Sequence, residues 1–228
     1  MNGWLKTGIK NIDDVLACQP DKLPLSKNKV INLIRAAEAT IKDSLVRRKR
    51  YQLTRLRSLN IDTSLLNKLY EKEGKQLEIA IDDLLKTPFL ELTCQRITKQ
   101  KEGEPDHLLY DSSGNVLAIQ TTAREKKNVS MKKATSVIGQ SAKYKPSGYI
   151  VFGRPDFEVL AIKNAEDQLR ASVNYKLIPI PVLAEMFVLF HEGKLSSNDV
   201  EKIFIEWVGY ITLVKLHEYV YSSSVKNK

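Results

Sequence analysis

The sequence predicts an α/β fold in which a mixed β-sheet is flanked by helices, with an all-helical region before it. Three observations predict this fold. Apolar residues recur at helical spacing through the first third of the chain. Between residues 89 and 123 the period changes to that of strands, and a turn sequence joins two of them. Beyond residue 129, helical segments alternate with two short apolar strands, as in strand–helix–strand crossovers.

The first third of the chain is expected to be helical throughout. Ser26 caps a pattern with apolar residues at helical spacing, and this pattern continues through an arginine-rich stretch to about residue 59. Residues 60–63 break the pattern, and a second helix is expected over 64–73. Gly74 marks a join, and a third helix over 75–86 ends before Pro88. A short helix is also expected at 12–16.

The strands come next. Residues 89–99 alternate in polarity, and residues 107–111 and 115–123 form two further strands. The turn Asp-Ser-Ser-Gly-Asn between the last two predicts an antiparallel hairpin. A helix is expected over 130–143, followed by a fully buried strand over 148–153. The remaining elements are expected as a helix at 165–173, a strand at 175–181, a helix at 183–191, and one long helix that Ser196 or Ser197 caps and that ends near Tyr221.

The length of 228 residues suits one large domain, or a compact core with an extension. We predict a helical N-terminal region over 1–73 and a core over 74–182. C-terminal helices over 183–228 are expected to pack on that core. The sequence contains no internal repeat.

The composition favours a soluble, cytoplasmic protein. Hydrophobic residues make up 43% of the chain, which is enough for a real core, and no run is long enough to span a bilayer. The first residues lack an apolar signal region. Cys18 and Cys94 lie far apart and belong to no Cys-x-x-Cys pair, which argues against a structural zinc site and favours two reduced thiols over a disulfide.

The formal net charge of +9 favours a polyanionic partner, above all nucleic acid. Solubility or an acidic protein partner would account for the same charge. Arg47, Arg48 and Arg50 concentrate positive charge on the first long helix, either as a DNA-backbone contact or as a solvated helical face. Lys126 and Lys127 follow the third strand and are expected to bind nucleic acid.

Polar residues mark the start of one strand and the end of the next. Glu104-Pro105-Asp106 opens the first strand of the hairpin, and Gln120 and Thr122 end the second. This arrangement resembles the PD-(D/E)XK superfamily, which includes restriction endonucleases, Holliday junction resolvases and RecB-type nucleases. The resemblance covers residues 74–182 and implies a restriction endonuclease-like core. It also implies that two acidic groups on adjacent strands hold a divalent metal, with a lysine two residues after the second acid.

Transferred to this chain, the resemblance implies a site of four residues. Asp106, Gln120 and Glu78 would hold Mg²⁺ or Mn²⁺, with Glu78 standing in for the helical glutamate of resolvase-type members. Thr122 would complete the catalytic set. Magnesium takes hard oxygen ligands and lowers the pKa of a bound water, so acids at these positions would suit phosphodiester hydrolysis.

Two further residues match the pattern, and two depart from it. Gln140 and Tyr144 match the QxxxY pattern of RecB-type members, which implies contact with the nucleic-acid backbone or support of the site. Gln120 replaces the second acid, and Thr122 replaces the lysine. The candidate replacement cations are Arg124, Lys126, Lys127 and Lys143.

Three functions remain open from the sequence. The first is a metal-dependent DNA endonuclease of the restriction or resolvase type, and the second is a degenerate member of the fold that binds DNA without cleaving it. The third is a helical protein-interaction module without affinity for DNA. The long helices at both ends would allow a homodimer.

Overall fold

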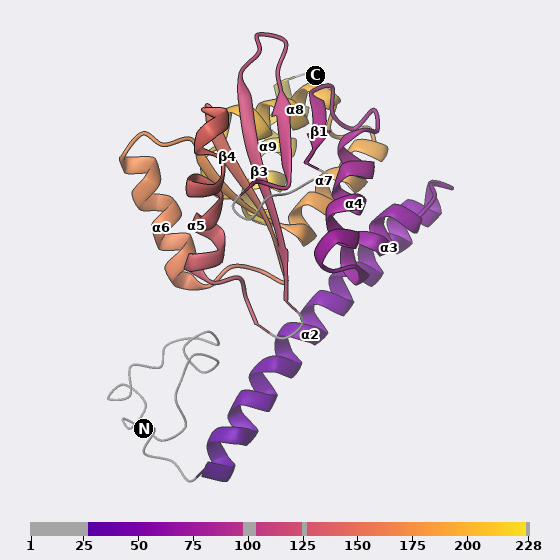
Figure 1. Cartoon of the computed structure of the whole chain (residues 1–228). Coiled ribbons are helices and arrows are strands. Elements are labelled where there is room, and N and C mark those ends of the chain that lie inside the picture. Colours follow the sequence, from indigo (N-terminus) through magenta and orange to yellow (C-terminus); the bar gives the residue numbers. More distant parts are fainter. Residues whose placement is uncertain (1–26, 98–103, 125–126, 227–228) are drawn as a thin grey trace.

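The computed structural model confirms the α/β fold, a mixed sheet flanked by helices, and describes residues 27–97, 104–124 and 127–226 (Figure 1). The helix expected at 12–16 lies outside the described residues. Among the described helices, none combines the length and apolarity that a bilayer span requires. The elements in chain order are α2 (Lys27–Ser58), α3 (Ser64–Glu71), α4 (Gly74–Leu85), β1 (Thr93–Arg96), β2 (His107–Tyr110), β3 (Val116–Ala123), α5 (Met131–Gln140), the 3₁₀ turn η3 (Ala142–Tyr144), β4 (Gly148–Arg154), α6 (Val159–Arg170), β5 (Tyr175–Pro179), α7 (Ile180–His191), α8 (Ser197–Glu206), β6 (Gly209–Tyr210) and α9 (Leu213–Lys226).

The six strands follow one another across the sheet in sequence order, from β1 to β6. The pairs β1–β2 and β2–β3 are antiparallel, and the pairs β3–β4, β4–β5 and β5–β6 are parallel. Helix α5 makes the crossover between β3 and β4, and α6 makes the crossover between β4 and β5. The predicted antiparallel hairpin and the strand–helix–strand crossovers after it are therefore confirmed.

The turn between β2 and β3 is organised by Asp111. Its carboxylate accepts hydrogen bonds from the backbone N–H groups of Ser113 and Asn115 at 2.9 and 2.8 Å, and from the Asn115 side-chain amide at 2.7 Å. Gly114 adopts a φ of 81°, a left-handed conformation that favours glycine. These bonds fix the register of the hairpin, which sets Leu109 opposite Leu117.

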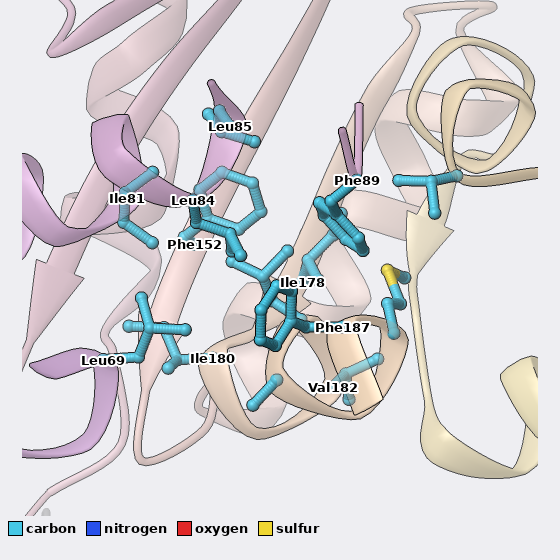
Figure 2. Close-up of a cluster of buried hydrophobic side chains, with 14 of the residues drawn as sticks. Leu69, Ile81, Leu84, Leu85, Phe89, Phe152, Ile178, Ile180, Val182 and Phe187 are labelled. Carbon is cyan, nitrogen blue, oxygen red and sulfur yellow. The ribbon is translucent and has the colours of Figure 1, made fainter. Parts of the chain in front are cut away.

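One face of the sheet carries the larger core. Helices α4 and α7 pack there, together with α2, α3, α8 and α9, and Figure 2 shows Leu84, Phe152 and Phe187 within this cluster. Phe89 is fully buried and packs edge-on against Phe187, with ring centroids 5.8 Å apart. The segment 89–92 was expected to be part of the first strand, but Phe89, Leu90 and Leu92 fill this core and β1 begins only at Thr93.

Helices α5 and α6 cover the other face. Ala134 and Val137 of α5 and Ala161 of α6 contact a smaller apolar cluster that includes Leu108 and Ala118 of the sheet. Helix α6 begins at Val159, six residues before the expected start. Its apolar residues Val159 and Leu160 are exposed while small alanines are buried, so apolar spacing is a poor guide to its start.

A buried polar network joins α2 to α7. Glu185 of α7 is only 3% exposed, and its carboxylate accepts hydrogen bonds from Gln52 at 2.9 Å and from Arg55 at 2.5 Å. The Arg55 guanidinium also donates two hydrogen bonds to the Glu192 carboxylate, at 2.7 and 2.8 Å. The Tyr70 hydroxyl donates to the Gln52 side-chain oxygen at 2.6 Å. Because each of these bonds crosses between helices, the network fixes how α2 lies on the sheet.

The expectation of one long C-terminal helix from residue 196 or 197 to Tyr221 was wrong. The structure has two helices, α8 and α9, separated by the short strand β6. Helix α8 ends at Glu206, and Gly209 then adopts a φ of 77°, which a continuous helix does not allow. The backbone of Gly209 and Tyr210 pairs with β5 instead, so this interruption extends the sheet by one strand.

The parallel strand β5 holds a lysine inside the core. Lys176 is fully buried, and its ammonium donates to the backbone carbonyls of Phe204 at 2.5 Å and Ile205 at 3.4 Å, in the last turn of α8. Burial lowers the pKa of Lys176 from 10.5 to about 7, because the charged form is desolvated.

This lysine predicts how stability depends on pH. Between about pH 7 and 10.5 the unfolded chain keeps the Lys176 proton and the folded chain has lost it, so the free energy of unfolding rises with pH in this window. The slope from one such group is at most ~1.4 kcal/mol per pH unit. Lys176→Met should remove this contribution, so urea denaturation at pH 7, 8 and 9 should show wild type gaining stability relative to the variant. Equal pH slopes for both proteins would contradict the prediction.

Candidate functional site

The start of β2 and the end of β3 bring Asp106 beside Gln120. The backbone N–H of Asp106 donates to the Ile119 carbonyl, and its own carbonyl accepts from the N–H of Ile97, both at 2.9 Å. Successive residues of a strand point to opposite faces. Asp106 therefore shares the α5 face with Leu108, and Gln120 shares it with Ala118, since both apolar residues belong to the cluster under α5 and α6.

The carboxylate of Asp106 is bonded to the neighbouring strand. The side chain is 3% exposed, and its Oδ2 accepts a hydrogen bond from Gln120 Nε2 at 3.0 Å and another from the backbone N–H of Thr121 at 2.6 Å. Hydrogen bonds to a carboxylate are among the stronger ones in proteins. Asp106 thus ties the start of β2 to the end of β3, and Gln120 turns a donor, not an oxygen, toward it.

Thr122 lies in a mostly apolar setting. In the β3–β4 pairing it stands opposite Gly153, and a Cβ on Gly153 would lie 2.4 Å from the ring of Phe157. The absence of a side chain at Gly153 therefore lets the Phe157 ring pack against the sheet beside Thr122. Thr122 itself is half-buried. The Phe157 ring therefore lies close to Thr122, the position where the resemblance implies a lysine.

A second polar group lies two residues before Asp106. Glu104 forms an ion pair with Lys143, and its Oε1 lies 3.5 Å from the Tyr144 hydroxyl. The Glu104 hydrogen bond raises the pKa of Lys143. The structure thus places Tyr144 of the expected QxxxY pair against the segment that leads to Asp106, while Gln140 ends α5 with its side-chain oxygen buried. Glu104 was not among the predicted site residues, and its spacing of two residues from Asp106 is the signal that could have identified it.

Glu78 packs on the opposite side of the sheet. The Nε2–H of His107 donates to the Glu78 backbone carbonyl at 3.1 Å, and His107 alternates with Asp106 along the strand. Burial lowers the pKa of His107 to about 4, and it raises the pKa of the half-buried Glu78, against the positive charge of Arg96. Helix α4 lays its apolar side on the larger core, so the structure does not bring Glu78 to the face that Asp106 and Gln120 share.

The side chains of this site do not fit the two-carboxylate metal centre that the resemblance implies. Across the described residues, no three His, Cys, Asp or Glu side chains form a group that could hold a metal ion. One oxygen of Asp106 already accepts two N–H donors, and the amide of Gln120 brings no charge. Mg²⁺ is usually held through one or two carboxylates together with substrate phosphates. The buried oxygen Gln120 Oε1 accepts no hydrogen bond, so Gln120 could offer a metal one neutral oxygen but no charge.

The predicted basic residues lie mainly along α2. Arg47 and Arg50 are exposed, Arg47 pairs with Asp43 at 2.6 Å, and Arg48 is half-buried. Lys127 is exposed, and Lys126 lies outside the described residues. Figure 1 shows α2, in indigo, running past the lower end of β3.

The sequence matches no protein-family model and no curated protein. Among solved structures, the chain is similar to one titled "Structure of restriction endonuclease FokI". The two share 10% sequence identity with a TM-score of 0.45, over 66% of this chain and 34% of the other. The chain thus spans about a third of the length of that protein.

The bonding of Asp106 predicts a stabilising role. Asp106→Ala would leave the Thr121 N–H and the Gln120 amide without their acceptor, at a cost of about 1–3 kcal/mol. Asp106→Asn keeps an oxygen acceptor and should cost less. Asp83→Ala serves as the control, because Asp83 is exposed and forms only a 3.4 Å pair with Lys68. Urea denaturation of the three variants measures the difference, and an Asp106→Ala loss no larger than that of the control would refute the role.

Proposed function

We propose that this protein binds DNA on a nuclease-like fold without cleaving it. The observation that carries the proposal is that the Asp106 carboxylate already takes part in hydrogen bonds within the protein. This carboxylate is buried and bonded to Gln120 and to the Thr121 N–H, and the residues around it do not form a metal centre. Hydrolysis of a phosphodiester by this type of site needs a metal that activates water and neutralises the developing charge.

Electrostatics support binding. The net charge of +9 favours a polyanion, and exposed arginines of α2 carry part of the surplus. Arginine and lysine side chains contact phosphates without reading the base sequence, and each contact releases condensed counterions. The expected mode is therefore binding that weakens steeply with salt and depends little on sequence.

A second candidate is the Mg²⁺- or Mn²⁺-dependent endonuclease, and the pair formed by Glu104 and Lys143 favours it. This pair supplies an acid and a lysine on the segments next to Asp106. In that case Glu104 would take the place of the missing second acid and Lys143 that of the missing lysine. Asp106 would first have to exchange its bond with Gln120 for a metal ligand bond.

One experiment separates these functions. Branched, linear duplex and single-stranded DNA are incubated with the protein and with Mg²⁺ or Mn²⁺, beside Asp106→Asn as the matched variant. We expect salt-sensitive binding by both proteins and cleavage by neither. Cleavage by wild type that disappears in Asp106→Asn would establish the endonuclease. Absence of binding at low salt would reject the proposal and favour a protein-interaction module.

A further inference from the structure

A cleft with charged side chains in its lining opens where α2 passes the carboxyl ends of β3 and β4. Its volume is about 360 Å³. In open α/β sheets, ligands bind outside the carboxyl ends of the parallel strands. Its charged lining residues come from α2, from the region of α3 and α4, and from the ends of β3 and β4, and they are Lys42, Lys49, Glu71, Glu73, Arg124 and Arg154.

Four cations and two acids line this cleft, so positive charge is in excess. Lys49 pairs with Glu71 at 2.5 Å, and Arg154 pairs with Glu73 at 3.3 Å. Arg154 also donates to the Leu69 carbonyl at 2.7 Å. The ion pairs among the described residues therefore account for both acids, and the charges of Lys42 and Arg124 remain for an outside anion.

Arg124 is held at the cleft by the sheet itself. Its backbone N–H donates to the Arg154 carbonyl at 2.9 Å, which continues the β3–β4 pairing beyond Ala123. Arg124 follows Gln120 and Thr122 at intervals of two residues. It was a candidate for the missing catalytic cation, and the structure shows that its side chain lines this cleft beside α2.

The positive charge continues along α2 beyond the cleft. A second cleft, of about 220 Å³, lies on the other flank of the helix, and its lining includes Arg48 and the acid Asp156. Arg50 is exposed on a neighbouring turn, and Arg47 is exposed but pairs with Asp43 at 2.6 Å. A helix of 32 residues is about 48 Å long. Basic residues spread along a helix of this length suit a long polyanion better than a small anion.

From these contacts we infer that the cleft between α2 and the ends of β3 and β4 binds the phosphate backbone of DNA, with Lys42 and Arg124 as the contacting residues. The inference rests on the proposed function and adds the location of the bound strand. DNA is held at the carboxyl edge of the sheet by residues outside the Asp106–Gln120 pair.

The test compares two double variants with equal changes in net charge. Lys42→Glu with Arg124→Glu alters the cleft, and Lys163→Glu with Lys202→Glu alters exposed lysines on α6 and α8. Binding to a fluorescein-labelled duplex is followed by anisotropy at several salt concentrations. The cleft variant should bind roughly tenfold more weakly than the control variant or worse, and its salt slope should fall by about two.

New glutamates in the cleft would lie close to Glu71 and Glu73, and this repulsion could disturb folding. A second set of variants therefore removes the positive charges without adding negative ones. Lys42→Gln with Arg124→Gln should also bind more weakly than Lys163→Gln with Lys202→Gln, with circular dichroism confirming that each variant is folded. Equal affinities of cleft and control variants, with wild type still binding DNA, would overturn the cleft while leaving the proposed function intact. Failure of wild type to bind would instead overturn the proposed function. Tighter binding to RNA of the same sequence would overturn the choice of DNA.

Discussion

The position of α2 depends on one buried charge, the carboxylate of Glu185. An ionised carboxylate in the core costs several kcal/mol unless partners satisfy it. Glu185 is 3% exposed, and both of its hydrogen bonds from α2 come from the same side of that helix, through Gln52 and Arg55. Removing Arg55 would take away the guanidinium that pairs with this carboxylate, and removing Gln52 would take the amide donor from its other oxygen, so both contacts favour the observed crossing of α2 over α7. The preceding turns of α2, which carry Lys42 and Lys49, are thereby set beside the ends of β3 and β4.

Hydrogen bonds also explain why the buried Asp106 carboxylate is held against β3. The β2–β3 pairing ends at His107 and Ile119, so the Thr121 N–H beyond it needs another acceptor, and a buried N–H without one costs about 1–3 kcal/mol. Asp106 supplies that acceptor to Thr121, and Gln120 satisfies the same oxygen with its amide. An acid at position 120 would repel Asp106 unless a cation lay between them. With glutamine there, the amide donates to Asp106 and the contact between the two side chains needs no cation.

Local sequence patterns predicted the fold better than the site. The order of strands followed from their period and from the Asp111 turn, because both are properties of adjacent residues. The interruption at Gly209 was missed, since β6 exists only through pairing with β5, a partner more than thirty residues away. The same limit applies to Glu78. Alternation tells which residues of a strand share a face, but it does not tell which helix covers that face, and His107 rather than Asp106 turned out to face α4.

The basic residues of the cleft beside α2 are held in place by other interactions than the Asp106 site. Under the proposed function, phosphate binding and phosphodiester hydrolysis would therefore depend on different residues. Arg124 is positioned by β3–β4 pairing, and Lys42 by the packing of α2 on α7. Neither depends on the identity of the side chains at 120 and 122. Under the proposed function, the positive surface at the edge of the sheet would therefore keep its geometry whichever side chains stand at positions 120 and 122. Charge on rigid elements is enough for phosphate contact, whereas hydrolysis also requires a metal held at a fixed distance from the scissile bond. Under the proposed function, Gln120 and Thr122 would leave the second requirement unmet and the first untouched.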